Sequence, residues 1–191
     1  EPVASGSFVP DAELFVCPRI KVSNRPHINK DRKIIYYRPF LRVGDKVMVA
    51  VAPVNGACLT SGFGNRRGRK HKGVDYQGKP APMIHAAAAG TIVEAEYRDD
   101  YGNMVVIDHG EGVYTRYAHL RGFQPGIKAG KKIPFGRPLG LMGSTAKWAL
   151  PLHLHYEILV GDYNTPKKSF GLRPKDPFWM LFETRPPSRS S

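Results

Sequence analysis

The segment Leu152-His153-Leu154-His155-Tyr156-Glu157-Ile158-Leu159-Val160 decides how the rest of this sequence is interpreted. It is rich in aliphatic and aromatic residues, which predicts a β-strand. Side chains alternate between the two faces of a strand. His153 and His155 should therefore project to the same side, about 6 to 7 Å apart along the chain. The segment predicts two imidazoles on one face of a sheet.

A second polar pair, His71 and Asp75, lies far upstream at a spacing of four residues. Glycines within and just after this pair argue against a helix, where glycine costs about 1 kcal/mol relative to alanine. We expect a loop that runs into a strand, with both side chains on one side. Catalytic zinc typically takes three protein ligands from His, Asp or Glu and leaves a fourth position for water. His71, Asp75 and one histidine of the His153/His155 pair would complete such a set.

The 29 basic and 16 acidic residues give a formal net charge of +13, which predicts an anionic partner. Nucleic acid, acidic lipid and the carboxylate-rich bacterial cell wall all fit. We find no nucleic-acid-binding motif and no array of aromatics among lysines, so we expect no nucleic-acid partner. Basic runs are usually solvated surface, but one run abuts His71 and favours attraction of an anionic substrate. The two main groups are Arg66, Arg67, Arg69, Lys70 and Lys72, and Lys128, Lys131, Lys132 and Arg137.

A chain of 191 residues with 41% hydrophobic residues can bury one good core. No apolar run approaches the roughly 18 to 20 residues that cross a bilayer. The sequence starts at Glu1 rather than at a methionine, and we expect a signal peptide or membrane anchor to precede it.

The two cysteines, Cys17 and Cys58, lack CxxC spacing, which excludes a zinc knuckle and a thioredoxin-like motif. They could form one disulfide or remain two buried thiols, and we favour the disulfide. By the chain-entropy model such a bond would stabilise the fold by about 3 to 4 kcal/mol in an oxidising compartment.

Frequent glycine turns divide the sequence after residue 50 into short β-rich runs. This pattern predicts a mainly β fold, an antiparallel sandwich or barrel-like core with few helices. Strands are expected at residues 47–53, 91–97, 104–109, 113–119, 138–142 and 152–160. One helix is expected at residues 176–182, capped by Asp176 with Pro177 in its first turn.

The predicted organisation has three parts. Residues 1–46 form an N-terminal extension or small lobe that packs on the core. Residues 47–183 form the main domain. Residues 184–191 are polar and proline-rich and form a disordered tail. The remaining histidines, His27, His85 and His109, lack companions at ligand spacing or follow a strand, and we expect structural roles for them.

Six segments, taken in order, carry a family resemblance. They are Ser61-Gly62-Phe63-Gly64, His71-Lys72-Gly73-Val74-Asp75, residues 86–90, Tyr101-Gly102-Asn103, Tyr117-Ala118-His119-Leu120 and His153-Leu154-His155-Tyr156-Glu157. Together they resemble the LytM or lysostaphin-type zinc metallo-endopeptidases of bacterial cell walls, over about residues 47 to 182. The resemblance implies one zinc ion held by His71, Asp75 and His155, with His119 and His153 as catalytic residues. It leaves open which of these two accepts the proton.

The resemblance implies zinc-dependent hydrolysis of peptide bonds in peptidoglycan, with the cross-link between D-alanine and a diamino acid as first choice. The alternatives are cleavage of a glycine bridge and a non-catalytic, wall-binding regulator of amidases. A periplasmic or extracellular location at the cell envelope is expected. A further hypothesis is autoinhibition, with the N-terminal extension lying across the groove.

Two departures from the family pattern bear on specificity. The segment between Gly64 and His71 is short, which predicts an open groove wall. Residues 144–152 include Trp148 where relatives carry small residues, which predicts a reshaped subsite.

Overall fold

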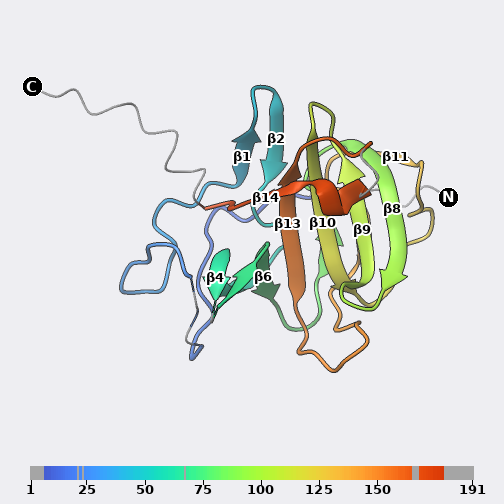
Figure 1. Cartoon of the computed structure of the whole chain (residues 1–191). Coiled ribbons are helices and arrows are strands. Elements are labelled where there is room, and N and C mark those ends of the chain that lie inside the picture. Colours follow the sequence, from blue (N-terminus) through green and yellow to red (C-terminus); the bar gives the residue numbers. More distant parts are fainter. Residues whose placement is uncertain (1–6, 21, 23, 67, 165–167, 179–191) are drawn as a thin grey trace, which may run out of the picture.

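The architecture is almost entirely antiparallel β-sheet (Figure 1). The computed structural model describes residues 7–20, 22, 24–66, 68–164 and 168–178. Over these residues the mainly β, antiparallel fold predicted from the turn pattern is confirmed. The main path of the central sheet runs in the spatial order β11 (Lys132–Ile133), β8 (Gly90–Arg98), β9 (Gly102–Asp108), β10 (Val113–Leu120), β13 (Leu154–Val160), β6 (Val74–Gln77) and β3 (Cys58–Ser61).

Strand β13 occupies the middle of this sheet and pairs along one edge with β10. Its other edge is shared, because β6 pairs with its first half and β14 (Arg173–Lys175) with its second half. Three two-stranded sheets complete the fold: β1 (Phe40–Val43) with β2 (Val47–Ala50), β7 (Met83–His85) with β12 (Pro138–Leu141), and β4 (Gly64–Arg66) with β5 (Arg69–His71).

Alternation along β13 separates the hydrophobic core from a polar face. Leu154, Tyr156 and Ile158 belong to the main core cluster. His155 and Glu157, one position out of phase, must point to the opposite face. A 3-10 helix, η1 (Lys168–Gly171), covers part of that face in Figure 1. Every residue of β10, which lies between β9 and β13, is buried.

The described N-terminal residues share the core of the sheet instead of forming a separate one. Leu14, Val16 and Ile34 lie in the same buried cluster as the central strands. Val16 also forms a parallel bridge with Leu59, which covers the edge of β3.

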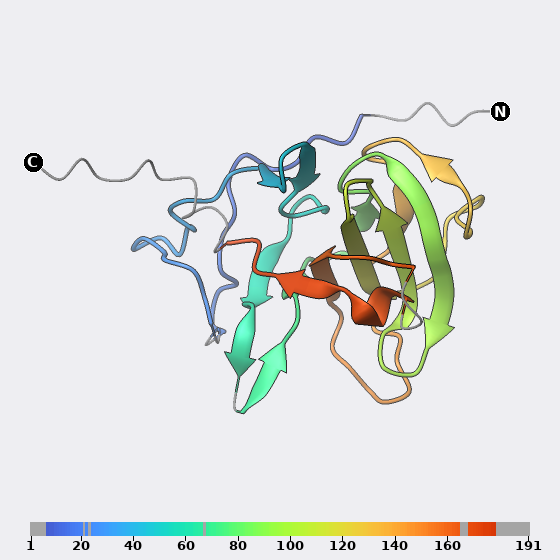
Figure 2. The same ribbon diagram turned by 45° about the horizontal axis from the view of Figure 1, so that its top comes forward.

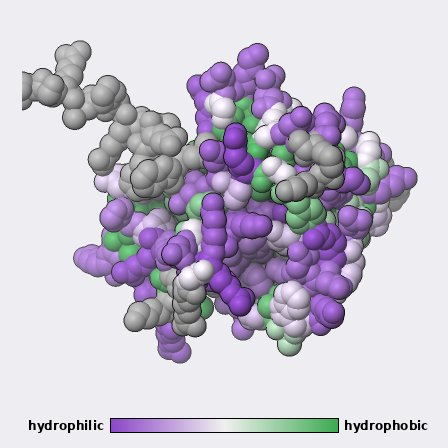
Figure 3. Space-filling model, viewed as in Figure 1, coloured by the Kyte–Doolittle hydropathy of each residue, from purple (hydrophilic) through white to green (hydrophobic). Residues whose placement is uncertain are grey.

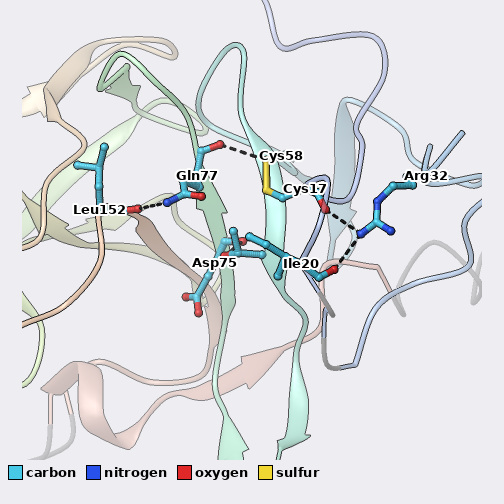
Figure 4. Close-up of a disulfide and its surroundings, with 8 residues drawn as sticks. Cys17, Ile20, Arg32, Cys58, Asp75, Gln77 and Leu152 are labelled. Atoms are coloured by element: carbon cyan, nitrogen blue, oxygen red, sulfur yellow. Dashed lines mark hydrogen bonds between the residues drawn. A yellow bond between two sulfur atoms is a disulfide. The ribbon is translucent and has the colours of Figure 1, made fainter.

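The two cysteines pair, which decides between the alternatives left open above. Cys17 and Cys58 form a disulfide that ties the N-terminal segment to β3 (Figure 4). Close by, the Arg32 guanidinium donates to the Cys17 and Ile20 carbonyls, at 2.7 and 2.9 Å. The segment is therefore held to the sheet by covalent, polar and apolar contacts.

The longer predicted strands match β8, β9, β10, β12 and β13 closely, and β2 ends at Ala50 instead of residue 53. The short strands β1, β3, β4, β5 and β7 were not predicted, because runs of three or four residues carry little periodic signal. Most of the helix expected at 176–182 lies outside the described residues. Within them, the Phe178 amide donates to the Asp176 carboxylate at 2.9 Å, and 176–178 are not helical. The expected tail at 184–191 also lies outside them.

Candidate metal centre and groove

His71, Asp75 and His155 converge because of strand register. Strand β6 pairs with β13 so that Asp75 lies directly opposite His155. His71 ends β5, four residues before Asp75. His155 Nδ1 lies 2.9 Å from Asp75 Oδ1, and His71 Nε2 lies 3.2 Å from Asp75 Oδ2. One ligand atom from each of the three buried residues lies within 4.8 Å of the others.

The tight turn between β5 and β6 needs glycine at position 73. A Cβ on Gly73 would lie 2.3 Å from the Tyr156 carbonyl oxygen and 3.0 Å from the His155 ring. Only a residue without a side chain lets the backbone approach β13 this closely. Gly73 therefore allows His71 and Asp75 to reach His155.

The three donors suit a divalent cation, with zinc as the best match. Zinc binds nitrogen and oxygen ligands at about 2.0 to 2.2 Å in a tetrahedron, so ligand atoms lie about 3.3 Å apart. The two short separations agree with this value. His71 Nδ1 donates to the Gly62 carbonyl at 2.7 Å, which orients the ring so that Nε2 faces Asp75. A shared cation would stabilise that arrangement.

The electrostatics of the cluster also favour a cation. Burial disfavours the charged form of Asp75, but hydrogen bonds from His155 and His71 outweigh burial and hold its pKa well below the usual range. Burial likewise disfavours the imidazolium of His155, but its contacts with Asp75 and Glu157 raise its pKa to about 9. The site therefore concentrates negative charge around His155.

A buried polar network holds His155 from its other side. His155 Nε2 lies 2.9 Å from Glu157 Oε1, which also accepts a hydrogen bond from the Tyr101 hydroxyl at 2.8 Å. The Arg116 guanidinium donates to Glu157 Oε2 at 2.5 Å and to Ser169 at 2.6 Å. Burial opposes ionisation of Glu157, but its contacts with His155, Arg116 and Tyr101 lower its pKa to about 2. With Nε2–H directed to the carboxylate, His155 offers Nδ1 to a metal.

His119 reaches the groove through a distortion of β10. The register of β10 against β9 shifts between Tyr117 and Leu120, and His119 takes a positive φ of 63°. Such a bulge re-aims a side chain, and positive φ in a non-glycine residue is strained. The Nδ1–H of His119 donates to the Thr145 carbonyl at 2.8 Å. Burial is the largest cause of the lowered pKa of His119, about 4, so the ring is neutral near pH 7.

His153 lies next to His119, with ring centroids 4.7 Å apart. Its Nδ1–H donates to the Pro151 carbonyl at 2.8 Å. Because Nδ1 of each ring is bonded to a backbone carbonyl, Nε2 is the ring nitrogen available for proton exchange. The two imidazoles thus lie as a pair beside the cluster of His71, Asp75 and His155.

A groove of about 340 Å³ contains all five residues, and Figure 3 shows a hydrophilic hollow at the centre of one face. The β4–β5 hairpin and the loop 144–152 extend toward the same end of the molecule in Figure 2. Both contribute to the lining, which consists of Arg66, Lys70, His71, Lys72, Asp75, Asp100, Tyr101, His119, Trp148, Leu150, His153, His155 and Glu157.

The structure separates the groove residues from the other histidines and basic residues. His109 Nδ1–H donates to the Ala89 carbonyl, and its Nε2 lies 2.7 Å from the Thr115 hydroxyl oxygen. His85 Nδ1–H donates to the Gly136 carbonyl. Of the basic run near His71, Arg66, Lys70 and Lys72 line the groove, Arg69 does not, and Arg67 lies outside the described residues.

Sequence reasoning assigned no role to several residues of the network. Glu157 was part of the quoted motif, and its position two residues after His155 was a usable signal, because strand alternation places both on one face. Arg116 reaches Glu157 because β10 pairs with β13, and Tyr101 reaches it from the turn before β9. The Gly62 and Thr145 carbonyls are backbone groups, so the residue types at these positions could not have predicted their contacts with the histidines.

Comparisons with known proteins agree with this geometry. Residues 69–167 match Peptidase family M23. The chain is 38% identical over 92 residues to the DD-carboxypeptidase/endopeptidase Mpg of Neisseria meningitidis, covering 48% of this chain and 20% of that protein. It is 34% identical over 100 residues to the peptidoglycan DD-endopeptidase ShyC of Vibrio cholerae, covering 52% and 22%. The chain thus spans about a fifth of the length of these relatives.

Solved structures with the same core include a zinc-containing peptidase from Vibrio cholerae, with a TM-score of 0.56 and 27% identity over 68% of this chain and 39% of that one. The catalytic domain of lysostaphin from Staphylococcus simulans gives a TM-score of 0.51 and 26% identity, over 63% and 89%. The family match covers more than half of the sequence and includes His71, Asp75, His119, His153 and His155. By fold and by sequence, this chain belongs to peptidase family M23.

Proposed function

We propose that this chain is a zinc-dependent endopeptidase that hydrolyses peptide bonds in peptidoglycan. The observation that carries the proposal is the convergence of His71, Asp75 and His155 beside His119 and His153 in one open groove. The names of the M23 relatives from Neisseria and Vibrio, which are DD-endopeptidases, support the substrate.

His71 Nε2, Asp75 and His155 Nδ1 would hold the zinc ion. When bound, zinc supplies a Lewis acid that polarises a carbonyl and lowers the pKa of water toward about 7. Glu157 keeps the His155 ring oriented through Nε2–H, and the Gly62 carbonyl does the same for His71.

His119 and His153 would manage protons and developing charge. Each ring is fixed through Nδ1–H to a backbone carbonyl, so Nε2 can accept a proton from the attacking water or later return it to the leaving amine. The partner imidazole, when protonated at Nε2, can stabilise the tetrahedral oxyanion by donating a hydrogen bond from Nε2–H. The lowered pKa of His119 keeps that ring in the proton-accepting form.

The proposed bond is the cross-link between D-alanine and a diamino acid. The DD-endopeptidase names of the relatives favour this bond over a glycine bridge. A purely regulatory, wall-binding role is less consistent with this chain, because all three ligands and both catalytic histidines are present and adjacent.

The substrate implies a location at the cell envelope, in the periplasm or outside the cell. Within the described residues, no helix is long and apolar enough to span a membrane. The described lining of the groove includes no residue between 7 and 50. We therefore propose that these N-terminal residues brace the fold and leave the groove accessible, in contrast to the autoinhibition hypothesis.

The test is digestion of purified peptidoglycan by the zinc-loaded chain, followed by mass analysis of the released fragments. Fragments ending in a D-alanine carboxylate, together with a freed diamino-acid amine, are expected. Chelation and His153→Ala should each abolish their release. Glycine-terminated fragments would assign the alternative bond, and unchanged wall material would contradict an enzymatic role.

A further inference from the structure

One wall of the groove carries three cations from the β4–β5 hairpin and the residue after it. Arg66, Lys70 and Lys72 all line the groove within a few residues of His71. The Arg66 side chain is 43% exposed, and one of its nitrogens donates to the Ser61 hydroxyl at 2.8 Å. The Lys70 ammonium lies 5.7 Å from the centre of the Phe63 ring. These three cationic groups lie near His71, Asp75 and His155 and are exposed to solvent.

The carboxylates of the groove have other partners. Asp75 lies between His71 and His155, Glu157 pairs with Arg116, and Asp100 pairs with Arg98 at 3.2 Å. Arg66 comes no closer than 3.9 Å to Asp75. In the described part of the chain, no carboxylate lies within ion-pair distance of the Lys70 or Lys72 ammonium. The hairpin wall therefore has two ammonium groups, on Lys70 and Lys72, that no described carboxylate neutralises, beside Arg66, which forms only a long contact with Asp75.

The opposite wall differs in character. Trp148 and Leu150, from the loop 144–152, line that side, and Trp148 is 54% exposed. A ligand that fits both walls would present carboxylates on one side and small apolar groups on the other. A peptide that carries free carboxylates beside alanine methyl groups has this chemistry.

We propose that Arg66, Lys70 and Lys72 form a carboxylate subsite, an inference that rests on the proposed function. The subsite selects peptides with free carboxylates over the same peptides with carboxamides. Guanidinium and ammonium groups bind carboxylates by charge-assisted hydrogen bonds. A carboxamide is uncharged, so the attraction between opposite charges is lost. The subsite lies beside His71, so the recognised carboxylate belongs to a residue close to the scissile bond.

The experiment compares two synthetic cross-linked stem peptides that differ only in carboxylate or carboxamide groups next to the cleaved bond. For the zinc-loaded chain we expect kcat/KM to favour the carboxylate peptide by about tenfold, mainly through KM, because two or three exposed ion pairs act together. The preference should shrink as ionic strength rises. The variant Lys70→Gln/Lys72→Gln should lower it to about twofold, since single exposed pairs contribute little.

Lys132→Gln is the matched control, because Lys132 is an exposed cation on β11 at the far edge of the sheet. It should keep the wild-type preference and cleave the carboxamide peptide at the wild-type rate, and all three proteins should bind equal amounts of zinc. Equal cleavage of both peptides by the wild type, or an unchanged preference in the double variant, would overturn the subsite.

Binding separates this inference from the proposed function. The affinity of both peptides for His153→Ala is measured by calorimetry, alongside the cleavage assay. If neither peptide is cut by the wild type, the endopeptidase proposal fails, yet tighter binding of the carboxylate form that depends on Lys70 and Lys72 would still support the subsite. Equal affinities would refute the subsite.

Discussion

The floor and the walls of the groove are built in opposite ways. The floor consists of side chains from β6, β10 and β13, buried and fixed by strand register and by a charged network. The walls consist of the β4–β5 hairpin and the loop 144–152, whose groove residues Arg66, Lys70 and Trp148 are exposed or half-exposed. Strands hold the residues of a site more precisely than loops do, and surface segments often carry binding residues. Changes to the floor should abolish function, and changes to the walls should alter specificity.

The largest effect is expected from Asp75→Ala. Asp75 contacts both of the other proposed zinc ligands. Its loss should therefore prevent zinc binding and lower kcat/KM by at least about a thousandfold, as when one member of a set of residues that act together is removed. Metal content by elemental analysis and cleavage of purified peptidoglycan are the measurements. Asp100→Ala, which removes an exposed groove carboxylate, should retain zinc. A metal-loaded, active Asp75→Ala protein would break the distinction between floor and walls.

Glu157→Ala should cause the next largest effect, on stability. Arg116 is fully buried, and removing its partner leaves an uncompensated charge at a cost of about 3 to 5 kcal/mol. Denaturant unfolding measures the loss. The double variant Arg116→Leu/Glu157→Leu should be more stable than Glu157→Ala, because no charge is left unpaired. If Glu157→Ala unfolds at the same denaturant concentration as the wild type, the network does not support the floor.

Trp148→Ala should affect recognition without weakening the fold. Its exposed ring borders the groove, so KM should rise about two- to fivefold with kcat nearly unchanged, as expected for loss of uniform binding. The free energy of unfolding should change by less than about 0.5 kcal/mol. Phe135→Ala, an exposed aromatic outside the groove lining, is the control. A drop in kcat at constant KM would instead place Trp148 in the chemistry.

The smallest effect, on the pH dependence of stability, is expected at His109. Its pKa is shifted in the opposite direction to that of His155 in the groove floor. Burial is the largest cause of its lowered pKa, whereas Asp75 and Glu157 raise that of His155. The folded protein thus binds a proton at His109 more weakly than the unfolded chain. The corresponding stability is present above pH 6.5, the ordinary pKa, and is lost as the pH falls below it. Thermal melts at pH 7.5 and pH 5 should show a smaller pH dependence for His109→Gln than for the wild type.

Local pattern predicted the long strands well, because β-rich runs bounded by glycine turns report directly on backbone preference. It also predicted that His153 and His155 share one face, which follows from the two-residue period of a strand. The role of Glu157 could have been inferred by the same rule. Short strands such as β4 and β7 were missed, since three residues carry almost no periodic signal.

The sequence by itself determined the donor types, the strand periods, the family and the excess of positive charge. The tertiary structure decided which donors meet: the register of β6 against β13 sets Asp75 opposite His155, and the bulge in β10 turns His119 into the groove. It also decided which cations line the hairpin wall. The physical reason is that alternation and propensity are local, whereas convergence depends on pairings between strands up to 80 residues apart.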